Sequence, residues 1–175
     1  MNIIIRQEQK KDYRTTEAVV KQAFLNEVFS DKKEHELVNR IRKSDAFIPE
    51  LSLVALDEEI VGHIMLSKIK IETAGVLVYS LALAPVSVAP DYQKKGVGGK
   101  LISAALTKAR ELGYQSVIVL GHKDYYPKFG FESASKWNIR APFDLPEEVF
   151  MAKELTDNAL RNVEGVVRYS EAFSE

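Results

Sequence analysis

At the junction between an apolar segment and an amphipathic one, the chain reads Val88-Ala89-Pro90-Asp91-Tyr92-Gln93-Lys94-Lys95-Gly96-Val97-Gly98-Gly99-Lys100. Three of the nine glycines of the chain lie in this stretch. Glycine lets the backbone approach a ligand closely and adopt positive φ without steric penalty. A helix that begins here offers free N–H groups and the positive end of its dipole to an anion, and the lysines add positive charge. The stretch therefore predicts a phosphate or pyrophosphate site.

Two nucleotide-binding motifs are close to this stretch, and both fail. A Walker A loop requires Ser or Thr after its Gly-Lys pair, whereas Lys100 is followed by Leu101. The dinucleotide fingerprint requires a third glycine at the position of Leu101. A nucleotide-binding protein is therefore disfavoured, and a glycine-rich turn without a ligand is the structural alternative.

Hydrophobic patterning places the glycines between a strand and a helix. Val76–Val88 is a nearly continuous apolar run, as expected for a strand covered on both faces of a sheet. Pro85 within it removes a ladder hydrogen bond, so the strand requires a bulge or a splay there. From Val97 onward apolar residues recur at helical spacing, and Gly113 is placed to end that helix.

The remaining pattern predicts an α/β (α+β) fold with one sheet and helices packed on it. Further strands are expected at Asn2–Arg6, Leu51–Leu56, Ile60–Ile71, Gln115–Leu120, Glu132–Ile139 and Val149–Leu155. Further helical segments are expected at Asp12–Phe24, Lys33–Lys43 and, as a short turn, Tyr125–Phe129. Residues 156–175 show no clear pattern. A chain of 175 residues fits a single domain spanning residues 1–175.

Composition excludes several classes of function. Lys and Arg number 24 against 25 Asp and Glu, a net charge of −1, which argues against a nucleic-acid partner. The absence of cysteine excludes disulfides, thiolate metal sites and a cysteine nucleophile. Thr73–Pro90 carries no charge but is interrupted by glycine and proline, so no membrane association is expected. The first residues lack the apolar core of a signal peptide, and we expect a cytoplasmic protein.

Two motifs in order carry a family resemblance. The pattern Val-x-Pro-x-x-Gln-x-x-Gly-x-Gly, from Val88 to Gly98, resembles the coenzyme A signature of the GNAT-type N-acetyltransferases. Downstream, Tyr125-Tyr126-Pro127-Lys128-Phe129-Gly130-Phe131 is similar to the Tyr-x-x-x-Gly-Phe segment of that superfamily. The resemblance covers about residues 3–155 and is strongest at 76–131. The segment Leu120–Phe131 looks most like the YhbS-like branch.

The resemblance implies a GNAT fold: a single mixed, mostly antiparallel sheet with helices on both faces and a splayed central strand pair. It implies acetyl-CoA as cosubstrate and no metal. The pantetheine arm would pair with the backbone of the strand ending at Val88, and the backbone amides of Lys94–Gly99 would hold the pyrophosphate. The expected cofactor-binding residues are Val86, Ser87, Val88, Gln93, Lys94, Lys95, Gly96, Val97, Gly98 and Gly99.

The implied reaction is direct attack of a primary amine on the acetyl thioester in a ternary complex. Tyr126 matches the family's tyrosine and is the expected catalytic acid, which would protonate the departing thiolate. Its alternative role is aromatic packing beside Phe129 and Phe131. The family's common Asn, seven residues before this tyrosine, would fall at Val119, so that contact with the coenzyme is absent.

The general base is left open, because Val76–Val88 contains no acidic residue. The candidates are Glu27, Glu72 and His122. Ser80 or Ser87 could instead order a water molecule. Residues of these types are more commonly surface or structural residues than catalytic ones. The missing carboxylate supports an alternative function, a catalytically silent regulatory module that binds CoA or acyl-CoA.

The acceptor is expected to be a small-molecule or peptide amine, and the protein a monomer or a homodimer. Acidic residues cluster at Glu27, Asp31, Glu34 and Glu36. They slightly favour a cationic acceptor, but Asp31 and Glu34 flank Lys32 and Lys33, so a solvated mixed-charge helix start explains them better. Trp137 and Phe143 either line an aromatic wall or belong to the core.

Overall fold

In the computed structural model, which describes residues 1–174, nine strands form one sheet in the order β1-β2-β3-β4-β5-β8-β6, and β9 pairs with β3 and β7. Glu175, the last residue of the predicted tail, lies outside the described residues. The strands are β1 (Ile4–Gln7), β2 (Ser52–Asp57), β3 (Glu59–Thr73), β4 (Val76–Val88), β5 (Ser116–Leu120), β6 (Glu132–Ser133), β7 (Ile139–Arg140), β8 (Phe150–Glu154) and β9 (Gly165–Arg168). The α-helices are α1 (Tyr13–Phe24), α2 (Glu34–Arg42) and α3 (Val97–Glu111).

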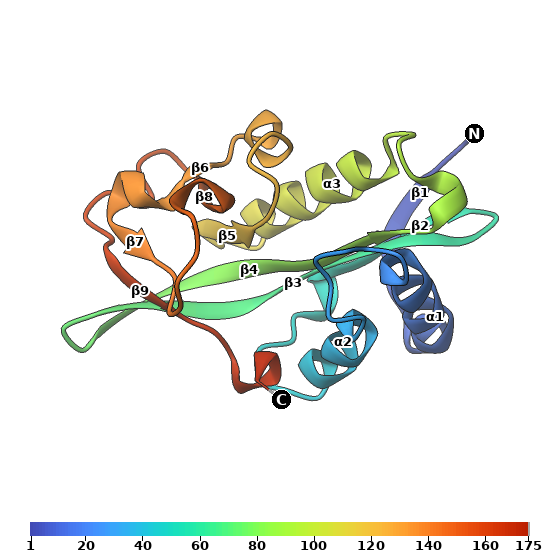
Figure 1. Cartoon of the computed structure of the whole chain (residues 1–175), viewed down its shortest axis with the longest axis horizontal. Coiled ribbons are helices and arrows are strands. Elements are labelled where there is room, and N and C mark those ends of the chain that lie inside the picture. Colours follow the sequence, from blue (N-terminus) through green and yellow to red (C-terminus); the bar gives the residue numbers. More distant parts are fainter. Residues whose placement is uncertain (175) are drawn as a thin grey trace.

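The sheet lies between helices, as the sequence predicted. Helices α1 and α2 cover one face and α3 covers the other (Figure 1). Most strand pairs are antiparallel, and the pairs β4–β5 and β7–β9 are parallel. The prediction of a mixed, mostly antiparallel sheet with helices on both faces is confirmed. The apolar run Val76–Val88 is the strand β4, and no helix within residues 1–174 is long and apolar enough to cross a membrane.

Strands β4 and β5 pair over only a short length. The registered pairs are Leu81 with Val117 and Ala82 with Ile118, after which the two strands separate toward Val88 and Leu120. The register between β3 and β4 also shifts, between Ile64 and Leu66. This irregularity lies opposite the part of β4 that contains Pro85, where the sequence required a bulge or a splay.

Two predictions at the C-terminal end were wrong or incomplete. Glu132–Ile139 is not one strand: it divides into β6, a 3-10 helix at Ala134–Trp137, and β7. The chain reverses at Asn138, whose φ of 57° is left-handed and incompatible with a continuous strand. The sequence also missed β9, whose four residues pair with β3 far away along the chain.

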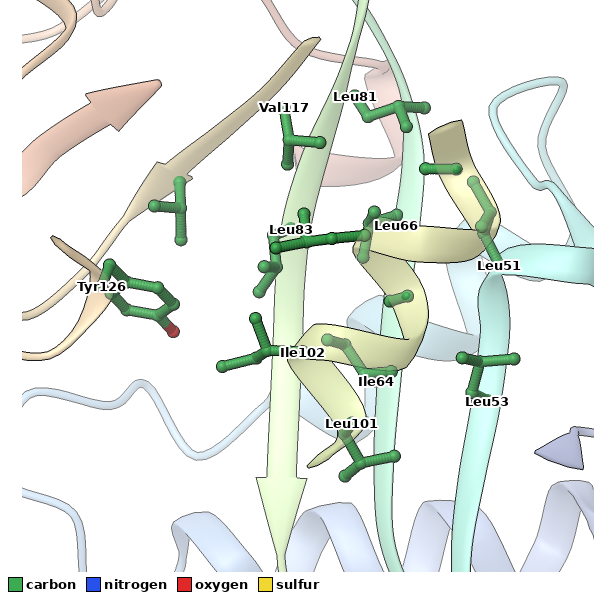
Figure 2. Packing of buried hydrophobic residues seen from close by; sticks show 14 of the residues in the cluster. Leu51, Leu53, Ile64, Leu66, Leu81, Leu83, Leu101, Ile102, Val117 and Tyr126 are labelled. Atoms are coloured by element: carbon green, nitrogen blue, oxygen red, sulfur yellow. The ribbon is translucent and has the colours of Figure 1, made fainter. Parts of the chain in front are cut away.

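The largest apolar cluster lies between the sheet and α3. Aliphatic side chains from both layers pack together there, as Figure 2 shows for Ile64, Leu66, Leu83, Leu101 and Ile102. These five side chains are at most 4% exposed. Full burial of an aliphatic side chain of this size contributes about 1.5–3 kcal/mol, so this cluster fixes α3 against β3 and β4.

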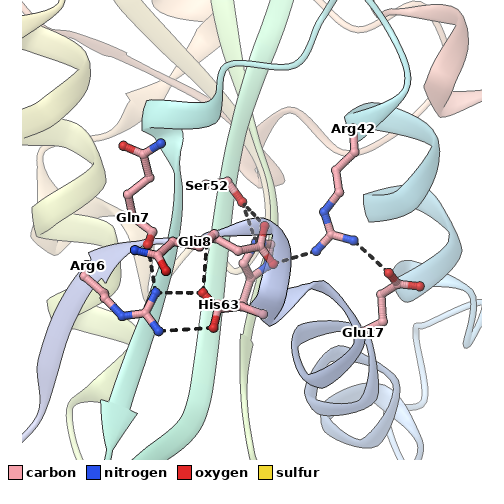
Figure 3. Close-up of polar contacts among 9 residues, drawn as sticks. Arg6, Gln7, Glu8, Glu17, Arg42, Ser52 and His63 are labelled. Carbon is pink, nitrogen blue, oxygen red and sulfur yellow. Dashed lines mark hydrogen bonds and ion pairs between the residues drawn. The ribbon is translucent and has the colours of Figure 1, made fainter.

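A buried polar network anchors the opposite face (Figure 3). The Arg42 guanidinium lies 2.6 Å from a Glu8 carboxylate oxygen and 2.8 Å from one of Glu17. Ser52 donates to the other Glu8 oxygen at 2.8 Å, and His63 Nε2 lies 2.9 Å from the Ser52 hydroxyl. The side chains of Glu8 and His63 are fully buried. The network therefore joins the end of β1, both N-terminal helices, β2 and β3.

Burial lowers the pKa of His63 from 6.5 to about 4; Glu8 partly opposes this shift and Arg42 adds to it. Between these two pH values the unfolded chain takes up a proton that folded His63 does not. We therefore expect the free energy of unfolding to fall by about 3 kcal/mol on acidification from pH 6.5 to 4 through this group. Urea unfolding across this range measures the loss.

The variant His63→Gln should lose most of this pH dependence, whatever its stability at pH 7. His122 is exposed, so His122→Gln is a matched control that should keep the dependence. A pH profile of His63→Gln that is as steep as the wild-type profile would contradict the assignment.

Candidate active site

Side-chain hydrogen bonds shape the turn between β4 and α3. The Gln93 amide donates to the carbonyl of Val88 at 2.9 Å and so holds the turn against the end of β4. The Tyr92 hydroxyl donates to the Asp57 carboxylate at 2.8 Å, which ties the same turn to β2. Gln93 thus has a structural role that the sequence did not predict.

Helix α3 begins at this turn with a glycine in the left-handed conformation. Gly96 is the N-cap residue with a φ of 86°, and no side chain caps the helix. The first backbone N–H groups of an α-helix have no partner within the helix, and the helix dipole favours negative charge there. Lys94, Lys95 and Lys100 are exposed around this helix start. The arrangement suits an anion.

A groove of about 580 Å³ opens beside the helix start. One wall comes from the end of β4 and the glycine turn, and the other comes from the aromatic segment after β5. Lys128 Nζ lies 4.3 Å from the centre of the Tyr125 ring, a cation–π contact that keeps this charge at the groove. A Cβ atom built on Gly98 would lie 3.2 Å from the Tyr125 hydroxyl. Gly98 is therefore the narrow point between the walls.

Six of the ten predicted cofactor-binding residues line this groove: Val88, Gln93, Lys94, Gly96, Gly98 and Gly99. Val97 does not, because it is 1% exposed and packs in the core beneath α3. Lys95 is exposed beside the groove, with Nζ 5.8 Å from the centre of the Tyr92 ring. Val86 is partly buried against the core cluster and is not among the residues that line the groove.

The side chain of Ser87 faces away from the groove. Ser87 lies directly across from His63 in the β3–β4 register and is 2% exposed. His63 belongs to the polar network beneath α1 and α2, so Ser87 is on that face too. A cofactor contact of Ser87 is therefore restricted to its backbone.

Tyr126 lies in the core next to the groove. It is 8% exposed, and its ring makes edge contacts with Tyr125 and Phe131, at centroid distances of 5.2 and 5.8 Å. Figure 2 shows the hydroxyl end of the ring directed toward Ile102 of α3. Burial raises the pKa of Tyr126 to about 12. The tyrosine therefore carries its proton at neutral pH, and it also has the packing role that the sequence left open.

Four further groove residues escaped the sequence reasoning, namely Tyr92, Tyr125, Lys128 and Phe129. Three of them belong to the aromatic motif from which only Tyr126 was selected. The sequence signal for these residues was the glycine turn, because an aromatic ring can pack closely against backbone that carries no side chains. The contact between Gly98 and Tyr125 is of this kind.

The candidate bases lie apart from one another. Glu72 of β3 lies opposite Leu77 of β4, which precedes in sequence the β4 residues that pair with β5. Its carboxylate accepts a hydrogen bond from Arg168 at 2.9 Å. The Ser80 hydroxyl is buried against that of Ser116 at 2.7 Å. Glu27 and His122 are exposed. Within residues 1–174, no group of three or more His, Asp or Glu side chains is arranged to hold a metal ion.

Comparison with known proteins gives consistent matches. Residues 5–134 match the family described as "Acetyltransferase (GNAT) domain". The chain is 32% identical to the uncharacterized N-acetyltransferase YhbS of Escherichia coli K12 over 154 residues, which cover 87% of this chain and 90% of YhbS. It is 41% identical to the uncharacterized N-acetyltransferase YjhQ of the same strain over 124 residues, covering 69% of this chain and 67% of YjhQ.

Two solved structures match over nearly the whole length. Escherichia coli YhbS in complex with CoA superposes with a TM-score of 0.89 at 28% identity, covering 100% of this chain and 93% of that one. A GNAT family acetyltransferase from Brucella melitensis in complex with acetyl-CoA superposes with a TM-score of 0.81 at 31% identity, covering 98% of each chain.

The fold and these matches define an acetyl-CoA-dependent N-acetyltransferase. The chain belongs to the GNAT acetyltransferase family, as its two motifs predicted, and among the relatives it resembles YhbS over most of its length.

We expect Gly98→Val to abolish measurable CoA binding while the protein stays folded, because the new side chain would occupy the narrow point beside Tyr125. Isothermal titration with CoA measures the affinity, and circular dichroism checks the fold. Ser103→Val is the matched control, since Ser103 is exposed on the same helix. Wild-type affinity in folded Gly98→Val would remove Gly98 from the site.

Proposed function

We propose that this protein transfers an acetyl group from acetyl-CoA to the primary amine of a small molecule or peptide, by direct attack in a ternary complex and within a single domain. The observation that carries the proposal is the groove at the start of α3, which meets the end of β4 at Val88. There the separation of β4 from β5 leaves one edge of β4 without a strand partner.

The cofactor would use both features. The pantetheine arm lies along the free edge of β4 and pairs with the backbone of Val86 and Val88, like an added strand. The pyrophosphate lies at the amides of Lys94–Gly99, at the positive end of the α3 dipole. Lys128 supplies positive charge from the opposite wall. The two structural neighbours were solved in complex with CoA and acetyl-CoA, which supports this class of cofactor.

The chemistry requires two proton movements. An alkyl amine with a pKa near 10.4 must lose a proton before it attacks the thioester carbonyl. The C–S bond then breaks, and the thiolate of CoA, whose conjugate thiol has a pKa of about 8.5, takes up a proton. Tyr126 is the proposed donor, because its hydroxyl is protonated at neutral pH. Its raised pKa makes it a weaker acid than free tyrosine, so the phenolate left by the transfer takes a proton back from water.

A catalytically silent CoA-binding module is the second candidate, because β4 carries no carboxylate. The two functions share the groove and differ in turnover. Release of free thiol from acetyl-CoA in the presence of amines distinguishes them: binding without thiol release, across a broad amine panel, would favour the silent module.

The first test is thermal unfolding with acetyl-CoA, CoA, ATP or NADH added separately. A ligand at about 100 times its dissociation constant stabilises the folded state by roughly 2.7 kcal/mol, which raises the Tm of a domain of this size by roughly 5–10 °C. We expect this shift with acetyl-CoA and CoA only. Absence of a shift with either, in folded protein, would contradict the proposal.

Tyr126→Phe should reduce kcat by about 100-fold, a typical effect of losing one general acid, with CoA affinity changed much less. Phenylalanine keeps the edge contacts with Tyr125 and Phe131, so packing is preserved. Tyr114→Phe, at a tyrosine outside the groove, is the control. Turnover equal to wild type would leave Tyr126 with a packing role alone.

Lys128→Met should weaken CoA binding by roughly tenfold, through loss of one charge-assisted phosphate contact. The loss should shrink as salt rises, because exposed charges are screened. Lys21→Met on α1 removes another exposed lysine from a different part of the surface and should leave affinity unchanged. Equal CoA affinity in Lys128→Met and wild type would exclude this contact.

A further inference from the structure

We propose that a small apolar cavity beside the end of β5 receives the body of the acceptor, and that the acceptor is a small primary amine carried on an aromatic or short aliphatic group. The inference rests on the proposed function and narrows its substrate class. It follows from the face to which β5 directs its last side chain, the cavity next to that side chain, and the charges at the cavity rim.

The first step concerns the alternation of side chains along β5. Val117 and Val119 pack in the cluster beneath α3, whereas Ile118 packs in a second cluster on the opposite face of the strand. Leu120, two residues after Ile118, is directed to the same face as Ile118. It lies beyond the last β4–β5 pair, where the strands separate, and it is 49% exposed. An exposed leucine therefore stands at the gap, on the side away from α3.

The second step connects Leu120 to a cavity. Leu120 pairs directly with Phe150 across β5 and β8, so the two side chains are neighbours on one face. Phe150 lines a cavity of about 240 Å³, together with Ile139, Ala141, Phe143 and Leu145. Leu120, at the point where β4 and β5 separate, is thus the direct cross-strand neighbour of a residue that lines the cavity.

The third step concerns the rigidity of the outer wall. The Phe143 ring stacks on Tyr169 with a centroid distance of 6.4 Å and an interplanar angle of 20°. The Tyr169 ring in turn contacts the Phe173 ring, with a centroid distance of 5.1 Å. Phe173 packs against two apolar clusters, the one that contains Ile118 and the one that contains Val38. Phe143 is nevertheless 50% exposed. A fixed aromatic ring that stays half-exposed at a cavity mouth offers a preformed contact surface to a ligand.

Size and charge then define the occupant. The cavity volume lies below the usual range of about 300–1,000 Å³ for drug-sized ligands, so it suits a single ring or a short alkyl chain. Asp144 and Glu147 at the rim outnumber Arg140, which gives an excess of negative charge that attracts an ammonium group. The five apolar lining residues favour an apolar body inside the cavity, because a second ammonium of a polyamine would find a partner only at the rim, at Asp144 or Glu147.

The test measures acetyl-CoA-dependent thiol release with matched amines: 2-phenylethylamine and hexylamine against spermidine and a lysine-containing peptide. We expect kcat/KM for the first two to exceed that for the others by roughly tenfold or more, as expected when an apolar pocket discriminates between substrates. Ligand-observed NMR with the CoA-bound protein, using the same amines, provides a readout that does not depend on turnover.

Two variants address the cavity itself. Phe143→Ala removes the stacked wall and should raise KM for 2-phenylethylamine by roughly tenfold, with the affinity for CoA unchanged. Ala141→Trp fills the cavity and should abolish both acetylation and NMR-detected binding of this amine. Tyr79→Ala is the matched control, because Tyr79 is an exposed aromatic residue outside the cavity, 66% exposed.

The outcomes separate this inference from the proposed function. Preference for the apolar amines, lost in the cavity variants and kept in Tyr79→Ala, supports the inference. A preference for spermidine, or turnover that neither cavity variant changes, would overturn the inference about the acceptor. The proposed acetyl transfer would then still hold. Acetyl-CoA binding without binding or acetylation of either apolar amine also overturns the inference about the acceptor. Failure to bind acetyl-CoA at all overturns the proposed function as well.

Discussion

The two-residue pairing between β4 and β5 is the constraint on which the rest of the structure depends. Because the strands separate after Ala82 and Ile118, the end of β4 has a free edge, and α3 can begin beside that edge. Separated strands expose backbone groups that a continuous sheet would satisfy. Apolar packing beneath α3 and the buried Glu8–Arg42 pair on the other face hold β3 and β4 in place and so keep the gap open.

The sheet also divides the proposed sites. The groove lies at the start of α3, whereas the acceptor cavity adjoins side chains of β5 and β8 on the face away from α3. A thioester in the gap between β4 and β5 would be accessible from both directions. On the proposed sites, two substrates would be bound together without sharing a surface, as direct attack in a ternary complex requires.

The sequence predicted the structure correctly where the local hydrophobic pattern and the tertiary structure agree. The apolar run Val76–Val88, its proline and the glycines that follow predicted β4, the irregularity and the start of α3. It failed where a few residues are held only by distant partners, as in β9, or where a left-handed Asn138 interrupts an extended pattern. A motif also does not show which side chains face a groove: Val97, selected for its backbone amide, buries its side chain in the core, and Lys128, which was not selected, lines the groove.

The absence of a carboxylate on β4 is consistent with an apolar acceptor site. Desolvation disfavours the charged form of an amine and lowers its pKa, by several units when burial is complete. Acidic groups at the rim, Asp144 and Glu147, would attract the ammonium form from solvent. Apolar walls at Leu120 and Phe150 would then favour loss of its proton to water as the amine approaches the gap. On the proposed acceptor site, apolar walls would thus assist the deprotonation for which β4 supplies no base, and the same walls would select the substrate.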